Sequence, residues 1–219
     1  AGDLPDCESM FALQQLMISI GSPNIDCRQD GTKLDVSNRA GYLFNSEIAG
    51  VDQSDCILLI GCDPRWEAPV LNARIRKRFL AGGLSIGLLG CLPERPNGLT
   101  YPYSNLGDNP AALVDISKGR HEFSQNLTEA SRPMIVIGQH ALSRSDGAAI
   151  LATAREIAEN FGMVRQDWNG FNVLHTAAAR VGGLEMGFVP GSDGLDVQGI
   201  LQGAVGGEIE IVYLLGADE

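Results

Sequence analysis

The sequence is short of the residues that several common classes of site require. Its five cysteines form no C-x-x-C pair and are odd in number, which argues against an iron–sulfur cradle and against a disulfide scaffold. Lys and Arg number 16 against 27 Asp and Glu, so nucleic acid and anionic membranes are poor partners for this chain. The cysteine usage favours a reducing, intracellular compartment.

Long apolar runs are missing as well. No stretch approaches the roughly 18 consecutive apolar residues of a membrane-spanning helix, and no basic-then-apolar leader opens the chain. We therefore expect no direct membrane insertion, and any membrane association to come through other subunits. Because the last strand-like run has no helix after it, we also expect the chain to be a fragment of a longer protein, truncated at its C-terminus.

The chain does contain apolar material for a core, arranged in alternating strand-like and helix-like segments. Apolar residues make up 44% of its 219 residues, enough for one large or two small domains. Four runs rich in Ile, Leu and Val and bounded by glycine predict buried parallel strands at residues 56–61, 84–90, 133–138 and 210–216.

Helical patterns separate these runs. The strongest cover residues 4–20, 68–80 and 146–161, and weaker ones cover residues 42–49, 109–118, 171–184 and 196–204. This alternation predicts an α/β fold in which Rossmann-like parallel sheets are flanked by helices.

A Rossmann-like unit and a second α/β unit are expected from this order. We expect residues 27–131 to form the first, and residues 1–26 plus 132–219 to form a second α/β unit. In the first unit, the turn at residues 61–67 lies at the carboxyl edge of the sheet, where such folds bind ligands. The Pro-rich stretch at residues 92–109 is expected to run over the surface.

Motifs for common enzyme chemistry are absent from the expected strand ends. GCDP after the first strand and GQHA after the third lack the G-x-G-x-x-G spacing of a nicotinamide site. There is no G-x-x-x-x-G-K-[ST] phosphate loop and no G-x-S-x-G nucleophile elbow. His121, His140 and His175 form no H-E-x-x-H pair, so we expect structural or surface roles for them, no catalytic residue and no metal site.

The turn after the first strand and the helix that follows it carry a run of charged residues with two interpretations. In one, Arg65 and Glu67 form surface ion pairs and the basic residues at 74–78 only decorate a helix end. In the other, Arg65, Arg74 and Arg76 contact a neighbouring subunit or another part of the same chain. Arginine suits that role because its planar guanidinium pairs with carboxylates through two hydrogen bonds.

Short strings distributed over nearly the whole chain carry a family resemblance. The strings ES (8–9), NIDCR (24–28), IAG (48–50), SDCILLIG (54–61) and DP (63–64) resemble the molybdopterin oxidoreductase domain of formate dehydrogenase-like enzymes. More specifically, the chain resembles the large iron–sulfur subunits of respiratory NADH:quinone oxidoreductase, complex I. The strings that carry this second resemblance are PRWEAP (64–69), NARIRK (72–77), LGD (106–108), DGAAIL (146–151) and LGAD (215–218).

The resemblance implies where a cofactor would lie. Active relatives present a metal ligand shortly after the Asp-Cys segment, where only Asp30 or Thr32 could serve here, and neither is a soft thiolate. The dinucleotide would face Gly61, Asp63 and Pro64, and an ionised Asp63 can only accept hydrogen bonds. We therefore expect these five residues to mark a vestigial site that holds no cofactor.

Two functions follow from this resemblance, together with a minor third possibility. The first is a non-catalytic structural and assembly domain of complex I, whose parent chain carries iron–sulfur clusters N-terminal to this segment and contacts other peripheral-arm subunits. It implies a location on the cytoplasmic or matrix face of the energy-conserving membrane. The second is the pterin-binding part of an active molybdenum or tungsten oxidoreductase. The third keeps the complex I assignment but allows a nucleotide or another small ligand in the vestigial crevice.

Overall fold

The computed structural model describes residues 1–90 and 98–217 and divides the chain into two compact units. Unit 1 comprises Ala1–Thr32 and Ala177–Glu219, and unit 2 comprises Lys33–Thr176. This division differs from the expected one at both boundaries. The predicted boundary at residue 132 would separate two strands that are hydrogen-bonded neighbours in one sheet, so the expected second sheet is not formed by residues 132–219.

Unit 2 is built on a five-stranded sheet with the order β3-β2-β1-β4-β7, in which every pairing is parallel. The strands are β1 (Cys56–Ile60), β2 (Ser85–Leu89), β3 (Ser104–Asn105), β4 (Pro133–Gly138) and β7 (Phe171–Leu174). β1, β2 and β4 confirm three of the predicted strands. Because β2 lies on one side of β1 and β4 on the other, the carboxyl ends of β1 and β4 form the topological switch point of the sheet.

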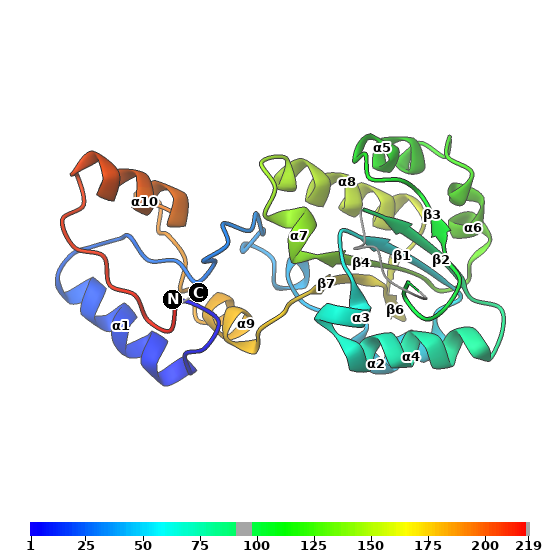
Figure 1. Cartoon of the computed structure of the whole chain (residues 1–219), viewed down its shortest axis with the longest axis horizontal. Helices are drawn as coiled ribbons and strands as arrows, with labels where there is room; N and C mark the ends of the chain where they lie inside the picture. The colour runs from blue at the N-terminus through cyan, green and yellow to red at the C-terminus, as the bar shows by residue number, and fades with distance from the viewer. Residues whose placement is uncertain (91–97, 218–219) are drawn as a thin grey trace. The chain divides into compact units, whose positions relative to one another are not determined.

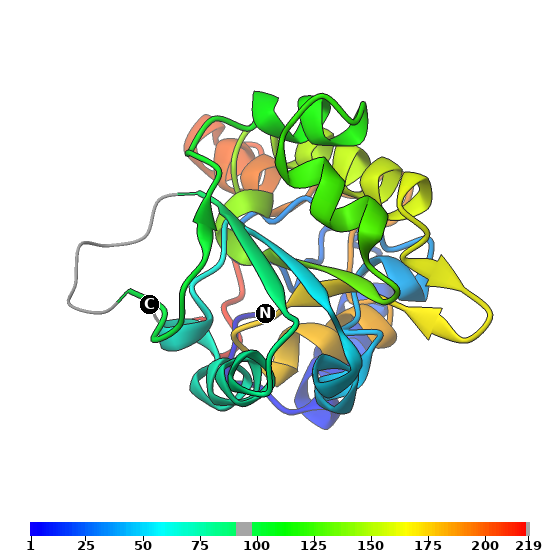
Figure 2. The same ribbon diagram turned by 90° about the vertical axis from the view of Figure 1, so that its right-hand side faces the viewer.

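Helices cover both faces of this sheet, as Figure 1 and Figure 2 show. One face carries α5 (Ala111–Ser117), α6 (Phe123–Glu129) and α8 (Gly147–Asn160), and the other carries α2 (Glu47–Gly50) and α4 (Pro69–Leu80). The short helix α3 (Pro64–Glu67) follows the turn after β1, and the short helix α7 (Gln139–Leu142) directly follows β4. This arrangement confirms the predicted α/β fold with a parallel sheet between helices.

The core of unit 2 lies between the sheet and these helices. All five residues of β1 are buried, as expected for a central parallel strand that is covered on both faces. In α4, Leu71 and Ile75 are one helical turn apart, face the sheet and are 4% and 0% exposed. Each such side chain contributes about 1.5–3 kcal/mol when it is fully buried.

The remaining strands of unit 2 were not predicted. The expected helix at residues 171–184 is wrong in its first part, because residues 171–174 form β7. Its amide residue Asn172 is fully buried, donates to the Ile135 carbonyl (3.3 Å) and accepts from the Ser46 N–H (2.9 Å). The chain reaches β7 through an antiparallel hairpin of β5 (Val164–Arg165) and β6 (Trp168–Asn169). Two 3-10 turns, η1 (Arg39–Gly41) and η2 (Val51–Gln53), complete the unit.

Unit 1 consists of helices and extended segments, and its described residues form no strand. Its helices are α1 (Cys7–Ser19), α9 (Ala178–Glu185) and α10 (Val197–Gly206). Asp6 and Asp196 begin α1 and α10 by accepting hydrogen bonds from Ser9 and Gly199. The strand predicted at residues 210–216 is absent from the described structure. Among the described residues, no helix of either unit has the length and apolarity needed to cross a membrane.

Candidate functional site

A crevice of about 930 Å³ opens at the switch point of unit 2, at the carboxyl ends of β1 and β4. This is the edge at which the sequence predicted a ligand site, because strand order reverses there and leaves room between the two turns. The lining residues that determine its shape and charge come from the turns after β1, β2 and β4 and from the loops near α5 and α8; they are Gly61, Asp63, Trp66, Glu67, Gly90, Asp108, His140, Ala141 and Arg144.

Glycines in the turns at this edge are required by protein packing. Gly61 has φ +52°, and a Cβ on it would lie 2.6 Å from the Cβ of Ala141. A Cβ on Gly90 would lie 3.2 Å from the Gly61 Cα, and one on Gly138 would lie 2.5 Å from the Cβ of Cys62. The turns therefore pack directly against one another. In a dinucleotide-binding fold the glycines of such a turn allow the phosphates to approach the backbone, whereas here they allow other protein atoms to do so.

Carboxylates dominate the charge of the crevice. Asp63 is 8% exposed, and its backbone N–H donates to Glu67 Oε1 at 2.7 Å. Glu67 Oε2 is buried and has no hydrogen-bond partner among the described residues. Burial raises the pKa of Glu67, and the nearby charge of His140 offsets this only in part. With Asp108 on the same lining, the crevice is unfavourable for the phosphates of a dinucleotide.

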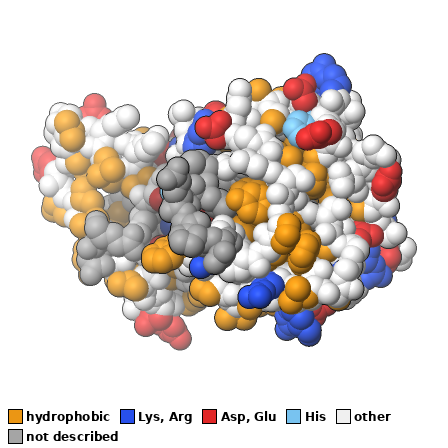
Figure 3. Space-filling model, turned by 45° about the vertical axis from the view of Figure 1, so that its right-hand side comes forward, with side chains coloured by type: hydrophobic (Ala, Val, Ile, Leu, Met, Phe, Trp, Pro, Cys, Tyr) orange, Lys and Arg blue, Asp and Glu red, His pale blue; other side chains and the backbone are white. Residues whose placement is uncertain are grey.

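The cations at the crevice do little to reverse this balance. Arg144 already pairs with Asp146 through two hydrogen bonds of 2.6 and 2.9 Å. His140 is on the lining and is exposed. Arg65, on the adjacent helix α3, donates to the Gly98 carbonyl at 2.7 Å. Figure 3 shows Lys and Arg side chains in separate small groups on the visible face, with Asp and Glu side chains among them.

The residues around Pro64 have separate roles. Pro64 is buried at the first position of α3, where its missing N–H is no loss. Trp66 lines the crevice and is 79% exposed. Of the three arginines that were predicted to contact a partner, Arg74 and Arg76 lie on α4. Arg74 pairs with Asp52 at 2.7 Å, and Arg76 is exposed.

The predicted metal-ligand candidates lie in unit 1 and bind an arginine. Arg180 of α9 is 3% exposed, and its Nη1 lies 2.8 Å from both carboxylate oxygens of Asp30 and 3.0 Å from Thr32 Oγ1. Arg180 Nη2 also lies 3.2 Å from a carboxylate oxygen of Asp3. Burial of the Asp30 carboxyl opposes its ionisation, but the hydrogen bonds from Arg180 and Thr32 outweigh this and lower its pKa. Sequence reasoning missed Arg180, which lies 150 residues from Asp30 in the chain.

A thiolate is not supplied by the neighbouring cysteine. Cys27 is fully buried in unit 1, and burial together with the charge of Asp26 raises its pKa to about 11. Cys62 in unit 2 is likewise buried, and burial raises its thiol pKa. Both thiols are therefore protonated at neutral pH. Within residues 1–90 and 98–217, no group of three His, Cys, Asp or Glu side chains is placed to hold a metal ion.

Two of the three histidines serve local structure, as predicted. His121 Nδ1 accepts from the Phe123 N–H at 3.1 Å at the start of α6. His175 Nε2 lies 2.6 Å from the Tyr42 carbonyl, and this contact ties the end of β7 to the segment beside it. His140 lines the crevice and is the one of the three that a ligand there would meet.

Comparison with known proteins gives consistent results over the whole length. Residues 1–219 match the molybdopterin oxidoreductase family. The chain is 40% identical over 219 residues to "NADH dehydrogenase [ubiquinone] iron-sulfur protein 1, mitochondrial" of Solanum tuberosum, covering all of this chain and 28% of that protein. It is 38% identical over 219 residues to an NADH-quinone oxidoreductase subunit of Rickettsia bellii, covering all of this chain and 30% of that protein. The chain thus spans less than a third of the length of these curated relatives.

Proposed function

The chain belongs to the molybdopterin oxidoreductase family, and from that premise we propose that it is a non-catalytic structural and assembly domain of the large iron–sulfur subunit of complex I. In this role it supports electron transfer from NADH to quinone, which other parts of the complex carry out. The proposal is supported by the similarity to a protein named as iron–sulfur protein 1 of a mitochondrial NADH dehydrogenase and to a bacterial protein named as a subunit of NADH-quinone oxidoreductase.

The observation that carries the proposal is the position of Arg180. Asp30 and Thr32 are the only candidates for a metal ligand in their segment, and both are bound to one buried guanidinium nitrogen. A metal cation at the same point would have to displace Arg180 Nη1 from Asp30 and Thr32 and would place a second positive charge beside a buried guanidinium, which is unfavourable.

The residues of this chain do not fit a molybdenum pterin. Asp30 is held by Arg180, and the Cys27 thiol is protonated at neutral pH. In unit 2 the crevice is lined by Asp63, Glu67 and Asp108, whose carboxylates would repel the phosphates of a dinucleotide. A recognition site for phosphate uses arginine, lysine or free backbone N–H groups, so this donor set is poorly suited to the group.

The parent protein supplies the remaining parts of the proposed function. Its iron–sulfur clusters lie N-terminal to this segment, and its partners are other peripheral-arm subunits and the cluster-binding part of its own chain. It is held at the cytoplasmic or matrix face of the energy-conserving membrane through those subunits.

The size and position of the crevice, in contrast to its charge, favour a second candidate function. Its volume of about 930 Å³ and its place at the switch point suit a cofactor-sized ligand, as in the pterin-binding part of an active molybdenum or tungsten oxidoreductase. A nucleotide bound without a metal is a weaker form of the same idea. Calorimetric titration of the full-length protein with guanine nucleotides is expected to give no heat of binding, and saturable heat would support a ligand in the crevice.

Elemental analysis of the intact parent protein in its native assembly tests the main proposal. Iron without molybdenum or tungsten is the expected result, because iron–sulfur clusters lie elsewhere in the chain and the ligands here are occupied by Arg180. One molybdenum or tungsten per chain would overturn the proposal and establish the oxidoreductase in its place. The iron content serves as the internal control, since its absence would mean that the assembly had lost its clusters during purification.

A further inference from the structure

Helix α4 of unit 2 has a second apolar face on the side away from the sheet. Leu71 and Ile75 are buried on its inner side, whereas Val70 is 73% exposed, Leu80 is 71% exposed and Ala73 is exposed as well. In Figure 1 and Figure 2, α4 lies at the outside of unit 2 with the sheet on its inner side. The helix therefore carries apolar residues on its inner and on its outer face.

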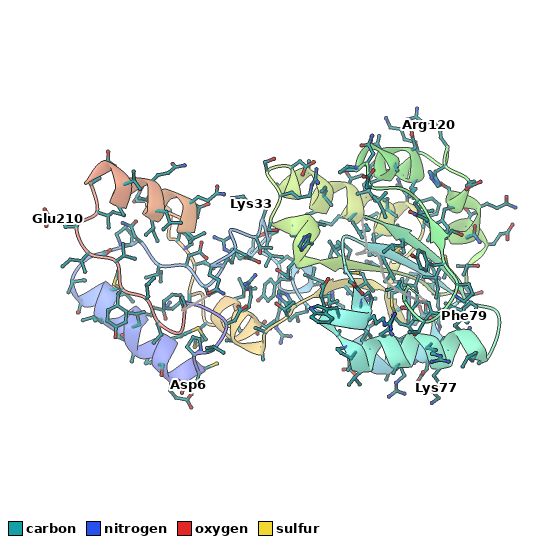
Figure 4. All side chains as sticks on the ribbon, viewed as in Figure 1. Asp6, Lys33, Lys77, Phe79, Arg120 and Glu210 are labelled. Atoms are coloured by element: carbon teal, nitrogen blue, oxygen red, sulfur yellow. The ribbon has the colours of Figure 1, made fainter. Side chains whose placement is uncertain are left out.

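The outer residues have the spacing of a helix-packing seam. Val70, Ala73, Lys77 and Leu80 are separated by three, four and three residues, which is the order of the apolar positions in two helices packed side by side. At 100° per residue they fall within about 80° of the helix surface, opposite Leu71. Lys77 can lay its apolar stem along such a seam while its ammonium stays in water, and Figure 4 shows this side chain pointing away from the sheet.

Cations flank the seam on both sides. Arg74 follows it on one side and pairs with Asp52 at 2.7 Å, while its side chain remains 37% exposed. Arg76 lies on the other side, is exposed, and has no ion-pair partner among the described residues. Residues in these flanking positions select the partner of a packed helix by charge. The net charge of the chain is -11, so this basic margin contrasts with an otherwise acidic protein.

The charges and the layers of the fold limit what covers this face. A second copy of α4 would bring Arg74, Arg76 and Lys77 against the same cations, which is unfavourable. The core of unit 2 does not need a further layer, because helices already cover both faces of its sheet. Arginines beside an apolar centre are instead typical of an interface between different proteins.

We propose that the outer face of α4 is the docking site for an amphipathic helix of another subunit, whose apolar residues are flanked by Asp and Glu. Val70, Ala73 and Leu80 pack against its apolar residues, and Arg76 pairs with one of its carboxylates. The small side chain of Ala73 at the centre lets the two helices approach closely. α4 has 12 residues, so the contact extends over about 18 Å. This inference rests on the proposed function, because it takes the partner from the other subunits of the parent complex.

Photo-crosslinking in the intact complex identifies the occupant. Lys77→p-benzoylphenylalanine in the full-length subunit places the reactive group in the seam, and mass spectrometry then identifies the linked peptide. We expect a peptide of another subunit, with apolar residues three and four positions apart and with Asp or Glu beside them. A link within the same polypeptide, a link to a second copy, a linked peptide without this pattern or no link at all would overturn the proposal. Any of these results in a complex that contains iron and no molybdenum or tungsten would leave the proposed function standing.

A matched pair of substitutions gives a second, independent measurement. Ala73→Glu places a charge in the seam, but its carboxylate lies one helical turn before Lys77 and supports the helix itself. We therefore expect several-fold lower incorporation of the subunit into the complex and an unchanged unfolding midpoint of the free subunit. Ala149→Glu is the control, because Ala149 is exposed on α8 at the other face of the sheet, and it is expected to change neither quantity. Equal incorporation of the two variants would contradict the proposal.

Discussion

Arg180 Nη1 lies at the point where Asp30 and Thr32 converge. Both carboxylate oxygens of Asp30 are 2.8 Å from this nitrogen, and the Thr32 hydroxyl oxygen, 3.0 Å away, accepts from it. Carboxylate and hydroxyl oxygens can bind a metal ion in the same arrangement, with both carboxylate oxygens and the neighbouring hydroxyl oxygen directed at one cation. Here the chain itself supplies a cation at this point.

Loss of this guanidinium is expected to destabilise unit 1. Arg180→Met would leave Asp30 and Asp3 as neighbouring carboxylates with no cation between them, at a cost of about 2 kcal/mol or more. The cost lies below that of a fully buried pair because the Asp30 side chain is 31% exposed. Denaturant unfolding followed by circular dichroism measures it, and hydrogen exchange of α9 localises it.

An exposed arginine of unit 2 is the control for this prediction. Arg120 pairs with Asp115 at 2.6 Å, but the two side chains are 60% and 49% exposed, and Figure 4 shows Arg120 pointing away from the sheet. Arg120→Met is expected to cost less than about 1 kcal/mol. Equal losses for the two variants would mean that the Arg180 pair contributes no more than a surface pair.

The packing of the turns predicts a large effect at Gly61. Gly61→Ala is expected to lower the free energy of unfolding by about 2–4 kcal/mol. The loss combines the strain of a side chain at φ +52° with a clash between the new Cβ and Ala141. Gly162→Ala measures the backbone strain alone, because Gly162 has φ +61° and a Cβ there meets nothing within 4 Å. This variant is expected to lose about 1 kcal/mol of unfolding free energy. The difference between the two unfolding free energies measures the contact between the turns, and a difference near zero would show that the turns can move apart.

The buried carboxyl of Glu67 predicts a pH-dependent stability. Its pKa is raised in the folded state, so the folded protein binds the proton more tightly than the unfolded chain does. The resulting stability is present below the unfolded pKa of Glu67 and is lost as pH rises through the folded pKa. Glu67→Gln keeps an oxygen for the Asp63 N–H and is expected to be more stable than the parent at pH 8, with the gap closing towards pH 4.

Unfolding free energies of both proteins across this pH range measure that gap. Glu156→Gln is the control, because Glu156 lies on α8 and is exposed. It is expected to change the stability little at either pH. A gap between the Glu67→Gln variant and the parent that does not vary with pH would contradict the role of burial at Glu67.

Local composition was sufficient to predict the centre of unit 2. β1, β2 and β4 are continuous apolar runs bounded by glycine, and the helix predicted at residues 68–80 matches α4 within one residue at its start. The crevice edge followed from the parallel connection of β1 to β2. These features depend on short stretches of sequence, where apolar pattern and helix signals agree.

Features that depend on distant residues could not be predicted. β7 carries the buried Asn172, whose partners Ile135 and Ser46 lie far away in the sequence, so its pattern does not read as a strand. The predicted boundary at residue 132 failed because β4 pairs with a strand that lies more than 70 residues earlier.

Arg76 is the predicted contact residue that the structure leaves most available to a partner. Arg65 donates to the Gly98 carbonyl and Arg74 pairs with Asp52, whereas Arg76 is exposed on α4. Arg76→Ala in the full-length subunit is therefore expected to lower its incorporation into the complex several-fold. It is expected to change the unfolding free energy of the free subunit by less than about 0.5 kcal/mol, as for other surface substitutions.

Native gel electrophoresis of the complex and thermal unfolding of the free subunit measure the two effects separately. Lys77→Ala is the matched control, because Lys77 is the next residue on the same helix and Figure 4 shows its side chain pointing away from the sheet. Equal incorporation of the Arg76→Ala variant and the parent would assign Arg76 to a solvated helix surface. Equal loss of incorporation for the Arg76→Ala and Lys77→Ala variants would indicate that assembly depends on the net charge of α4. A specific contact would instead require Arg76, because its guanidinium can pair with a partner carboxylate through two hydrogen bonds and the ammonium of Lys77 cannot.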